Sequence, residues 1–136
     1  SLHEIDFSDA LVKVNADKKI TVSVNTLDKF CKTNKISKIH FLKVDIEGHE
    51  LQMFDGSKDM LNKNLICFIQ FEFGGGINPQ FRIFFKDFWN LFSDNYIIYR
   101  VLQNGLYEIK NYDVRWEQYY CTNFVAELKD KSNFIK

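Results

Sequence analysis

The stretch FLKVDIEGHE, residues 41–50, decides how the rest of the chain can be arranged. Its apolar first part leads into four ionisable side chains within six residues, Asp45, Glu47, His49 and Glu50. This pattern is typical of a buried β-strand that delivers carboxylates to its carboxyl end. Ligands of open α/β sheets bind beyond the carboxyl ends of the strands. We therefore interpret the acidic cluster as a candidate site.

The composition indicates a single folded domain. The chain has 136 residues, of which 46% are hydrophobic and 26% charged, enough for a core and too apolar for a disordered protein. Its 18 basic and 18 acidic residues cancel, so no global field favours nucleic acid or a membrane surface. The longest apolar run, residues 65–69, is too short to span a membrane, and no signal-peptide pattern opens the chain. We expect a cytoplasmic protein with neither a nucleic-acid nor a membrane partner.

Cysteine usage and the first residue give two further expectations. Cys31, Cys67 and Cys121 are odd in number and widely separated, which favours reduced core thiols over a disulfide framework or a zinc site. The chain begins with Ser1 and not with methionine, so we expect it to be an excised piece of a longer protein.

Hydrophobic periodicity predicts strands that alternate with helices. Residues 1–19 have only a weak pattern and are predicted to be irregular. Strands are predicted at residues 20–25, 39–45, 65–73, 96–103, 106–111 and 121–128. Asn104-Gly105 is predicted to form a two-residue hairpin turn. Residues from 130 onward are predicted to fray.

Three helices are predicted between these strands. The first, residues 27–34, follows Thr26 as its N-cap, and the second, residues 48–62, is interrupted at Gly56. The third, residues 79–93, starts with Asn78 as cap and Pro79. Its phenylalanines recur at helical spacing and are predicted to lie in the core: Phe81, Phe84, Phe85, Phe88 and Phe92.

The alternation predicts an α/β fold with a mostly parallel sheet and helices on its faces. Right-handed crossovers place the carboxyl ends of strands 39–45 and 65–73 side by side. We therefore expect Asp45, Glu47 and Glu72 to share one rim of the sheet.

Carboxylates at such a rim can hold a divalent cation, act as a general base or orient a hydroxyl group. Asp45 with Glu72, helped by His49, has the chemistry for each of these roles. The structural alternative is that Asp45 and Glu47 cap the following helix, and spacing alone does not decide between the two. His40, inside a strand, is expected to be packed, and His49 is expected at the surface.

Residues 24–30, VNTLDKF, followed by residues 41–50, resemble the FkbM-type S-adenosylmethionine-dependent methyltransferases. That family's pattern here is a strand, a TLD helix start and then a strand that ends in a K-x-D-x-E-G sequence. Residues 54–56 match its usual Leu-x-Gly with phenylalanine in place of leucine. The resemblance covers residues 20–75 best.

The resemblance implies a Rossmann-like methyltransferase sheet in which the strand ending at Asp45 is the fourth and the last strand is antiparallel. Asp45 would then face the transferable methyl group, and Asp45 or Glu72 would be the catalytic base. Glu47 and His49 would shape the substrate pocket. The cofactor would be S-adenosylmethionine, and the acceptor a sugar or another small hydroxylated metabolite.

One part of the family pattern is missing: these 136 residues lack the glycine loop D-x-G-A-N-x-G that holds the cofactor. We expect the cofactor-binding residues upstream of Ser1, with residues 20–128 forming a C-terminal part, inactive alone, and residues 129–136 a tail. The open edge of strand 39–45 could then pair in a homodimer. The alternatives are a non-catalytic α/β interaction or self-association module and, with less support, a metal-dependent hydrolase using Asp45, Glu47, His49 and Glu72.

Overall fold

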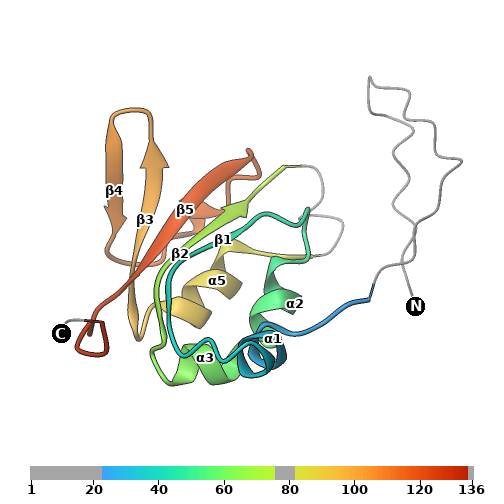
Figure 1. The fold of residues 1–136 in the computed structure, drawn as a ribbon. Coiled ribbons are helices and arrows are strands. Elements are labelled where there is room, and N and C mark those ends of the chain that lie inside the picture. Colours follow the sequence, from blue (N-terminus) through green and yellow to red (C-terminus); the bar gives the residue numbers. More distant parts are fainter. Residues whose placement is uncertain (1–22, 76–81, 135–136) are drawn as a thin grey trace, which may run out of the picture.

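The computed structural model describes residues 23–75 and 82–134, which form one sheet with helices packed on it. The strands are β1 (Ile39–Val44), β2 (Ile66–Phe73), β3 (Tyr96–Leu102), β4 (Gly105–Ile109) and β5 (Thr122–Leu128). The helices are α1 (Leu27–Thr33), α2 (Glu50–Asp55), α3 (Lys58–Asn62) and α5 (Phe85–Phe92), with a short 3-10 helix η1 (Val114–Trp116). Figure 1 shows the helices gathered on one side of the sheet.

The sheet is mixed, so the prediction of a mostly parallel sheet is wrong, although the α/β class is confirmed. Its strand order is β1-β2-β5-β3-β4, and only β1 and β2 pair in parallel. The pairs β2–β5, β5–β3 and β3–β4 are antiparallel. The cause is the position of β5, which runs against the other long strands and inserts between β2 and β3. The expected antiparallel direction of the last strand is thereby confirmed.

The first helix begins where the sequence predicts. Thr26 is its N-cap, and the Thr26 Oγ1 accepts a hydrogen bond of 3.2 Å from the backbone N–H of Lys29. The Asp28 carboxylate reaches across to α3 and accepts from the N–H groups of Asp59 and Met60, at 2.9 and 3.1 Å. Of the strand predicted at residues 20–25, residues 20–22 lie outside the described residues, and 23–25 are not in a strand.

The helical region after β1 is divided as predicted. Gly56 is the C-cap of α2, and α3 starts two residues later. Ser57, the N-cap of α3, is fully buried, and its hydroxyl donates a 2.7 Å hydrogen bond to the Met53 carbonyl. The two short helices therefore turn around a satisfied polar group.

Phenylalanine rings fill the space between the sheet and the helices. Phe71 of β2 stacks on Phe88 of α5 at 4.7 Å and on Phe124 of β5 at 5.6 Å, between ring centroids. Phe54 of α2 meets Phe92 edge to face at 5.0 Å. The predicted core stripe is confirmed for Phe85, Phe88 and Phe92 and is wrong for Phe84, which is half exposed; Phe81 lies outside the described residues.

Helix α5 begins later than predicted because its N-terminal donors are satisfied from a distant part of the chain. The Glu117 carboxylate accepts from the N–H groups of Phe85 and Lys86 at 2.7 and 3.0 Å. The Asp87 carboxylate accepts from the N–H of Phe84 at 2.8 Å. Residues 82–84 are not helical, and the predicted start at Asn78 and Pro79 lies outside the described residues.

The described end of the chain is held against β1 and α3, contrary to the expected fraying. The ring of Phe134 packs on the core and meets the His40 ring edge to face at 5.3 Å. The prediction that His40 is packed inside the sheet is wrong, because apart from this ring contact its side chain is exposed. Over the ranges that the structure describes, no helix is long and apolar enough to cross a membrane.

Candidate functional site

The carboxyl ends of β1 and β2 lie side by side, as the sequence predicts. In the parallel register Val44 pairs with Phe71, so Asp45 and Glu72, one residue further along each strand, lie at the same rim. The positions of the two carboxylates thus follow from the backbone pairing of the two strands.

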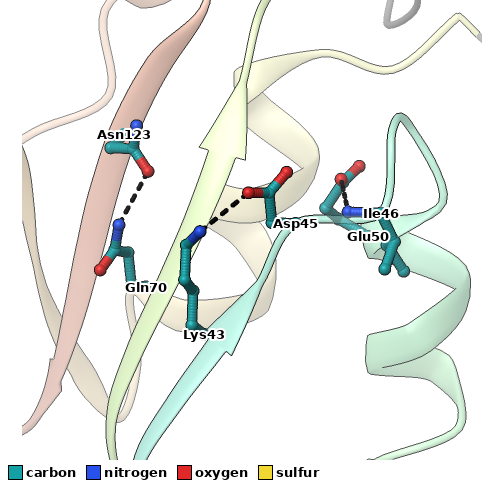
Figure 2. A network of polar contacts seen from close by, with 6 residues as sticks. All are labelled: Lys43, Asp45, Ile46, Glu50, Gln70 and Asn123. Carbon is teal, nitrogen blue, oxygen red and sulfur yellow. Dashed lines mark hydrogen bonds and ion pairs between the residues drawn. The ribbon is translucent and has the colours of Figure 1, made fainter.

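Asp45 is held by a lysine of its own strand (Figure 2). The Lys43 Nζ donates to the Asp45 Oδ2 at 2.8 Å, and both side chains are about half exposed. This hydrogen bond raises the pKa of Lys43, helped by the charges of Asp45 and Glu72. Residues two apart in an extended strand face the same way, which is why the pair can form. The Asp45 carboxylate is therefore accessible and fixed from one side.

The turn after Asp45 is folded around a buried carboxylate. Glu50 is only 2% exposed, and its Oε1 accepts from the N–H groups of Ile46 at 3.1 Å and Gly48 at 3.3 Å. Glu47 and Gly48 both have positive φ, 56° and 91°. A positive φ is strained for Glu47, which has a side chain, and not for Gly48. The hydrogen bonds to Glu50 therefore help to hold the turn in this conformation. Glu50 thus sets the path of the backbone that carries Asp45 and Glu47.

Cys121 brings a thiol to the same rim. The cysteine precedes β5 and is exposed, so the expectation of a core position is wrong for it, while Cys31 and Cys67 are buried as predicted. The Glu72 carboxylate hydrogen-bonds the thiol, and this bond, burial and the charges of Glu72, Glu47 and Asp45 raise the pKa of Cys121 to about 11. The charges of Asp45, Glu47 and Glu72 therefore all act on this thiol and keep it protonated.

The loop before β5 closes the rim where β2 ends. The Gly75 N–H donates to the Tyr119 carbonyl at 2.9 Å. Gly74 has φ +114°, and a Cβ built there would lie 2.2 Å from the Tyr120 carbonyl oxygen. Only glycine permits this close approach. Residues 74–76 are three consecutive glycines, which the sequence alone favours as a flexible loop; the structure instead gives Gly74 a close packing contact and Gly75 a backbone hydrogen bond, and Gly76 lies outside the described residues.

His49 follows the same turn and is the N-cap residue of α2. It is half buried and lines a mostly apolar cavity of about 650 Å³ between α2 and the segment that leads into α1. Ile46 lines the same cavity, directly after Asp45. The structure thus brings Asp45 and Glu72 to one rim, has the charge of Glu47 act on the thiol there, and places His49 in the lining of a neighbouring cavity.

The geometry does not support two alternatives that the sequence left open, namely a helix cap formed by Asp45 and Glu47 and a metal-dependent hydrolase. The N-cap of α2 is His49, which makes no side-chain capping bond, and the acid in the first turn is Glu50. Asp45 is bonded to Lys43 and does not cap the helix. Among the described residues there is no group of three or more histidine, cysteine or acidic side chains able to hold a metal ion, so the hydrolase alternative has no ligand set there.

Open α/β sheets bind their ligands beyond the carboxyl ends of the strands, where this acidic rim lies. Residues 3–110 match the model of the FkbM methyltransferase domain, and the chain therefore belongs to this methyltransferase family. Searches among curated proteins and among solved structures found no match.

The roles of three residues of the site, Lys43, Glu50 and Cys121, were not predicted from the sequence. The Lys43–Asp45 pair could have been predicted, because residues two apart in a strand lie on the same face. A glutamate in the first turn of a helix predicts an exposed side chain, so Glu50 gave no signal of burial. The place of Cys121 beside Glu72 depends on the antiparallel pairing of β5 with β2, a contact that local pattern does not encode.

Proposed function

We propose that this protein transfers a methyl group from S-adenosylmethionine to a hydroxyl oxygen, with Asp45 and Glu72 at the acceptor side of the reaction. The observation that carries the proposal is the pair of adjacent strand ends, which holds both carboxylates at one rim within the region matched by the methyltransferase family. A sugar or another small hydroxylated metabolite is the acceptor class that we propose.

The charge of the rim fits the proposed donor. Asp45, Glu47 and Glu72 act together on the Cys121 thiol, and the Lys43 ammonium is hydrogen-bonded to Asp45. Three carboxylates against one lysine leave the rim negative, which attracts a cation such as a sulfonium. When bound, S-adenosylmethionine supplies an electrophilic methyl group on a positively charged sulfur. The described residues contain no glycine loop to hold the rest of the cofactor, and we propose that this part binds outside them.

The chain's own residues would then handle the acceptor. The carboxylate of exposed Asp45 or of partly buried Glu72 accepts the hydroxyl proton as the acceptor oxygen takes the methyl carbon from the donor sulfur. The Lys43 ammonium, 2.8 Å from the Asp45 Oδ2, holds that carboxylate in one orientation. Ile46, directly after Asp45, and His49 line the neighbouring cavity with an apolar and a polar group, against which the acceptor is aligned. Glu47 is proposed to contact the acceptor from the turn.

The test is methyl transfer by the product of the complete gene. The protein is incubated with methyl-labelled S-adenosylmethionine and a panel of sugars, polyols, phenols and amines, and the methylated products are identified by mass spectrometry. We expect an O-methyl ether of a hydroxylated acceptor, with S-adenosylhomocysteine formed in equal amount. Absence of cofactor binding by calorimetry, or transfer to amines alone, would overturn the proposal.

A second candidate function, self-association, is supported by the free edge of β1. Within the described ranges β1 pairs only with β2, and Phe41 is 56% exposed on it. An unpaired strand edge is a template for pairing with another chain. Sedimentation analysis of wild type and Phe41→Lys distinguishes the cases: we expect a dimer that the charge disrupts, and a monomer at all concentrations would refute self-association.

A further inference from the structure

A second cavity lies at the opposite edge of the sheet from Asp45. It has a volume of about 640 Å³ and is formed by β4 and the segment from Lys110 to η1, within the size range of small-molecule sites. The strand order places β2, β5 and β3 between β1 and β4. At roughly 4.8 Å for each strand-to-strand step, this cavity is about 19 Å across the sheet from β1, which carries Asp45, and about 14 Å from β2, which carries Glu72. It is therefore separate from the proposed reaction centre.

Two aromatic side chains form one wall of this cavity. The rings of Tyr107 and Trp116 lie 5.9 Å apart at an angle of 44°. Trp116 is braced from behind by Phe85 of the core, at 6.5 Å, whereas Tyr107 is 54% exposed. Ring faces carry negative electrostatic potential and attract polarised C–H groups. This aromatic wall, in which Trp116 is fixed and Tyr107 is exposed, suits the C–H face of a pyranose ring.

The polar groups of the cavity are fixed in place before any ligand binds. Arg115 donates to both oxygens of Asp113, from Nε at 2.8 Å and from Nη2 at 3.0 Å. These hydrogen bonds lower the pKa of Asp113 to about 2, so the pair stays charged. The Tyr112 hydroxyl donates to Glu117 at 2.9 Å, and that carboxylate is itself anchored on α5. Donors and acceptors held this way bind without an added ordering cost.

The charges of the lining select the kind of ligand. Glu108 and Asp113 oppose Lys110 and Arg115, two acids against two bases, so the cavity has no net formal charge. An anion therefore gains nothing overall, whereas a neutral ligand with many hydroxyl groups can use both donors and acceptors. We propose that this cavity is a binding site for a neutral saccharide, which stacks on Tyr107 and Trp116 and hydrogen-bonds the Asp113–Arg115 pair.

The chain offers an internal control for the test, because it has two tryptophans. Trp116 lines the cavity and Trp89, on α5, does not. In ¹H–¹⁵N spectra of the full chain, methyl glucopyranoside and methyl galactopyranoside, and the disaccharides built from them, are titrated against the two indole N–H signals. We expect a saturable shift of the Trp116 signal with an unchanged Trp89 signal, and millimolar Kd values.

Substitutions inside and outside the cavity test whether the saccharide binds there. Tyr107→Ala and Arg115→Ala remove exposed side chains and should raise the Kd at least tenfold, whereas Tyr120→Ala removes an 80% exposed tyrosine outside the cavity and should leave it unchanged. The proposal is overturned by a missing Trp116 shift up to about 50 mM glycoside, well above a millimolar Kd. It is also overturned if glucose 6-phosphate or benzyl alcohol binds more tightly than the neutral glycosides, or if both cavity variants bind like wild type.

Discussion

The buried Glu50 carboxylate gives the sharpest test of how the turn after Asp45 is built. Its Oε1 accepts two backbone hydrogen bonds, from Ile46 and Gly48, and none of the described groups hydrogen-bonds its Oε2. Glu50→Ala removes both acceptor contacts and leaves two N–H groups without a partner, next to a turn with Glu47 at φ 56°. A buried N–H group left without an acceptor costs about 1–3 kcal/mol, and removal of the buried carboxyl group offsets part of the loss.

We expect Glu50→Ala to lower the free energy of unfolding by about 3 kcal/mol, which for a chain of this length is about 10 °C in Tm. Glu50→Gln keeps an oxygen acceptor for both N–H groups and should cost only about 1 kcal/mol. The assay is urea unfolding followed by circular dichroism, with Glu108→Ala, an exposed glutamate of β4, as the control expected within about 0.5 kcal/mol of wild type. A loss below about 1 kcal/mol for Glu50→Ala, or equal losses for Ala and Gln, would refute this reasoning.

Two further predictions concern the rest of the rim. Gly74→Ala should destabilise the protein by more than about 3 kcal/mol, because its Cβ would lie 2.2 Å from the Tyr120 carbonyl oxygen. Gly75→Ala, at φ +71° with open space around it, should cost about 1 kcal/mol. Equal unfolding free energies for the two variants would contradict the close approach of Gly74 to Tyr120. The pKa of Cys121 is raised from 9.0 to about 11, so at pH 8 its thiolate fraction is about one hundredth of that of an ordinary thiol. Iodoacetamide should therefore label Cys121 slowly, at a rate that rises tenfold per pH unit up to about pH 11. Glu72→Gln removes the main cause of that shift and should speed labelling at pH 8 by more than about tenfold, measured by peptide mass spectrometry; an unchanged rate would show that Glu72 does not hold the thiol.

The parts of the fold that depend on neighbouring residues were predictable from the sequence. Thr26 caps α1, Gly56 divides the two short helices, and β1 and β2 deliver Asp45 and Glu72 to one rim. Each of these rests on a cap, a glycine or a hydrophobic period within a few residues. The β3–β4 hairpin was also found, although its turn is shifted by one residue, with Leu102 paired to Gly105.

The parts that depend on distant contacts were not predictable. The insertion of β5 between β2 and β3 makes the sheet mixed, and no local pattern distinguishes this from a parallel arrangement. Helix α5 starts at Phe85 because Glu117, 32 residues later in the chain, supplies its cap. The same long-range loop brings Cys121 to Glu72, so the thiol was assigned to the core when it lies at the site.

The most direct test of the account compares two ion-paired aspartates of the same chain. Asp45 is bonded to Lys43 at the proposed reaction centre, and Asp55 is bonded to Lys58 at an exposed helix end away from it. The turnover of methyl-labelled S-adenosylmethionine by the complete gene product is measured for wild type, Asp45→Asn, Glu72→Gln and Asp55→Asn. Because a general base contributes about 10²–10⁴-fold, we predict that Asp45→Asn or Glu72→Gln lowers kcat by about 10²-fold or more while Asp55→Asn remains as active as wild type. Wild-type turnover in both rim variants would contradict the assignment of the rim as the reaction centre.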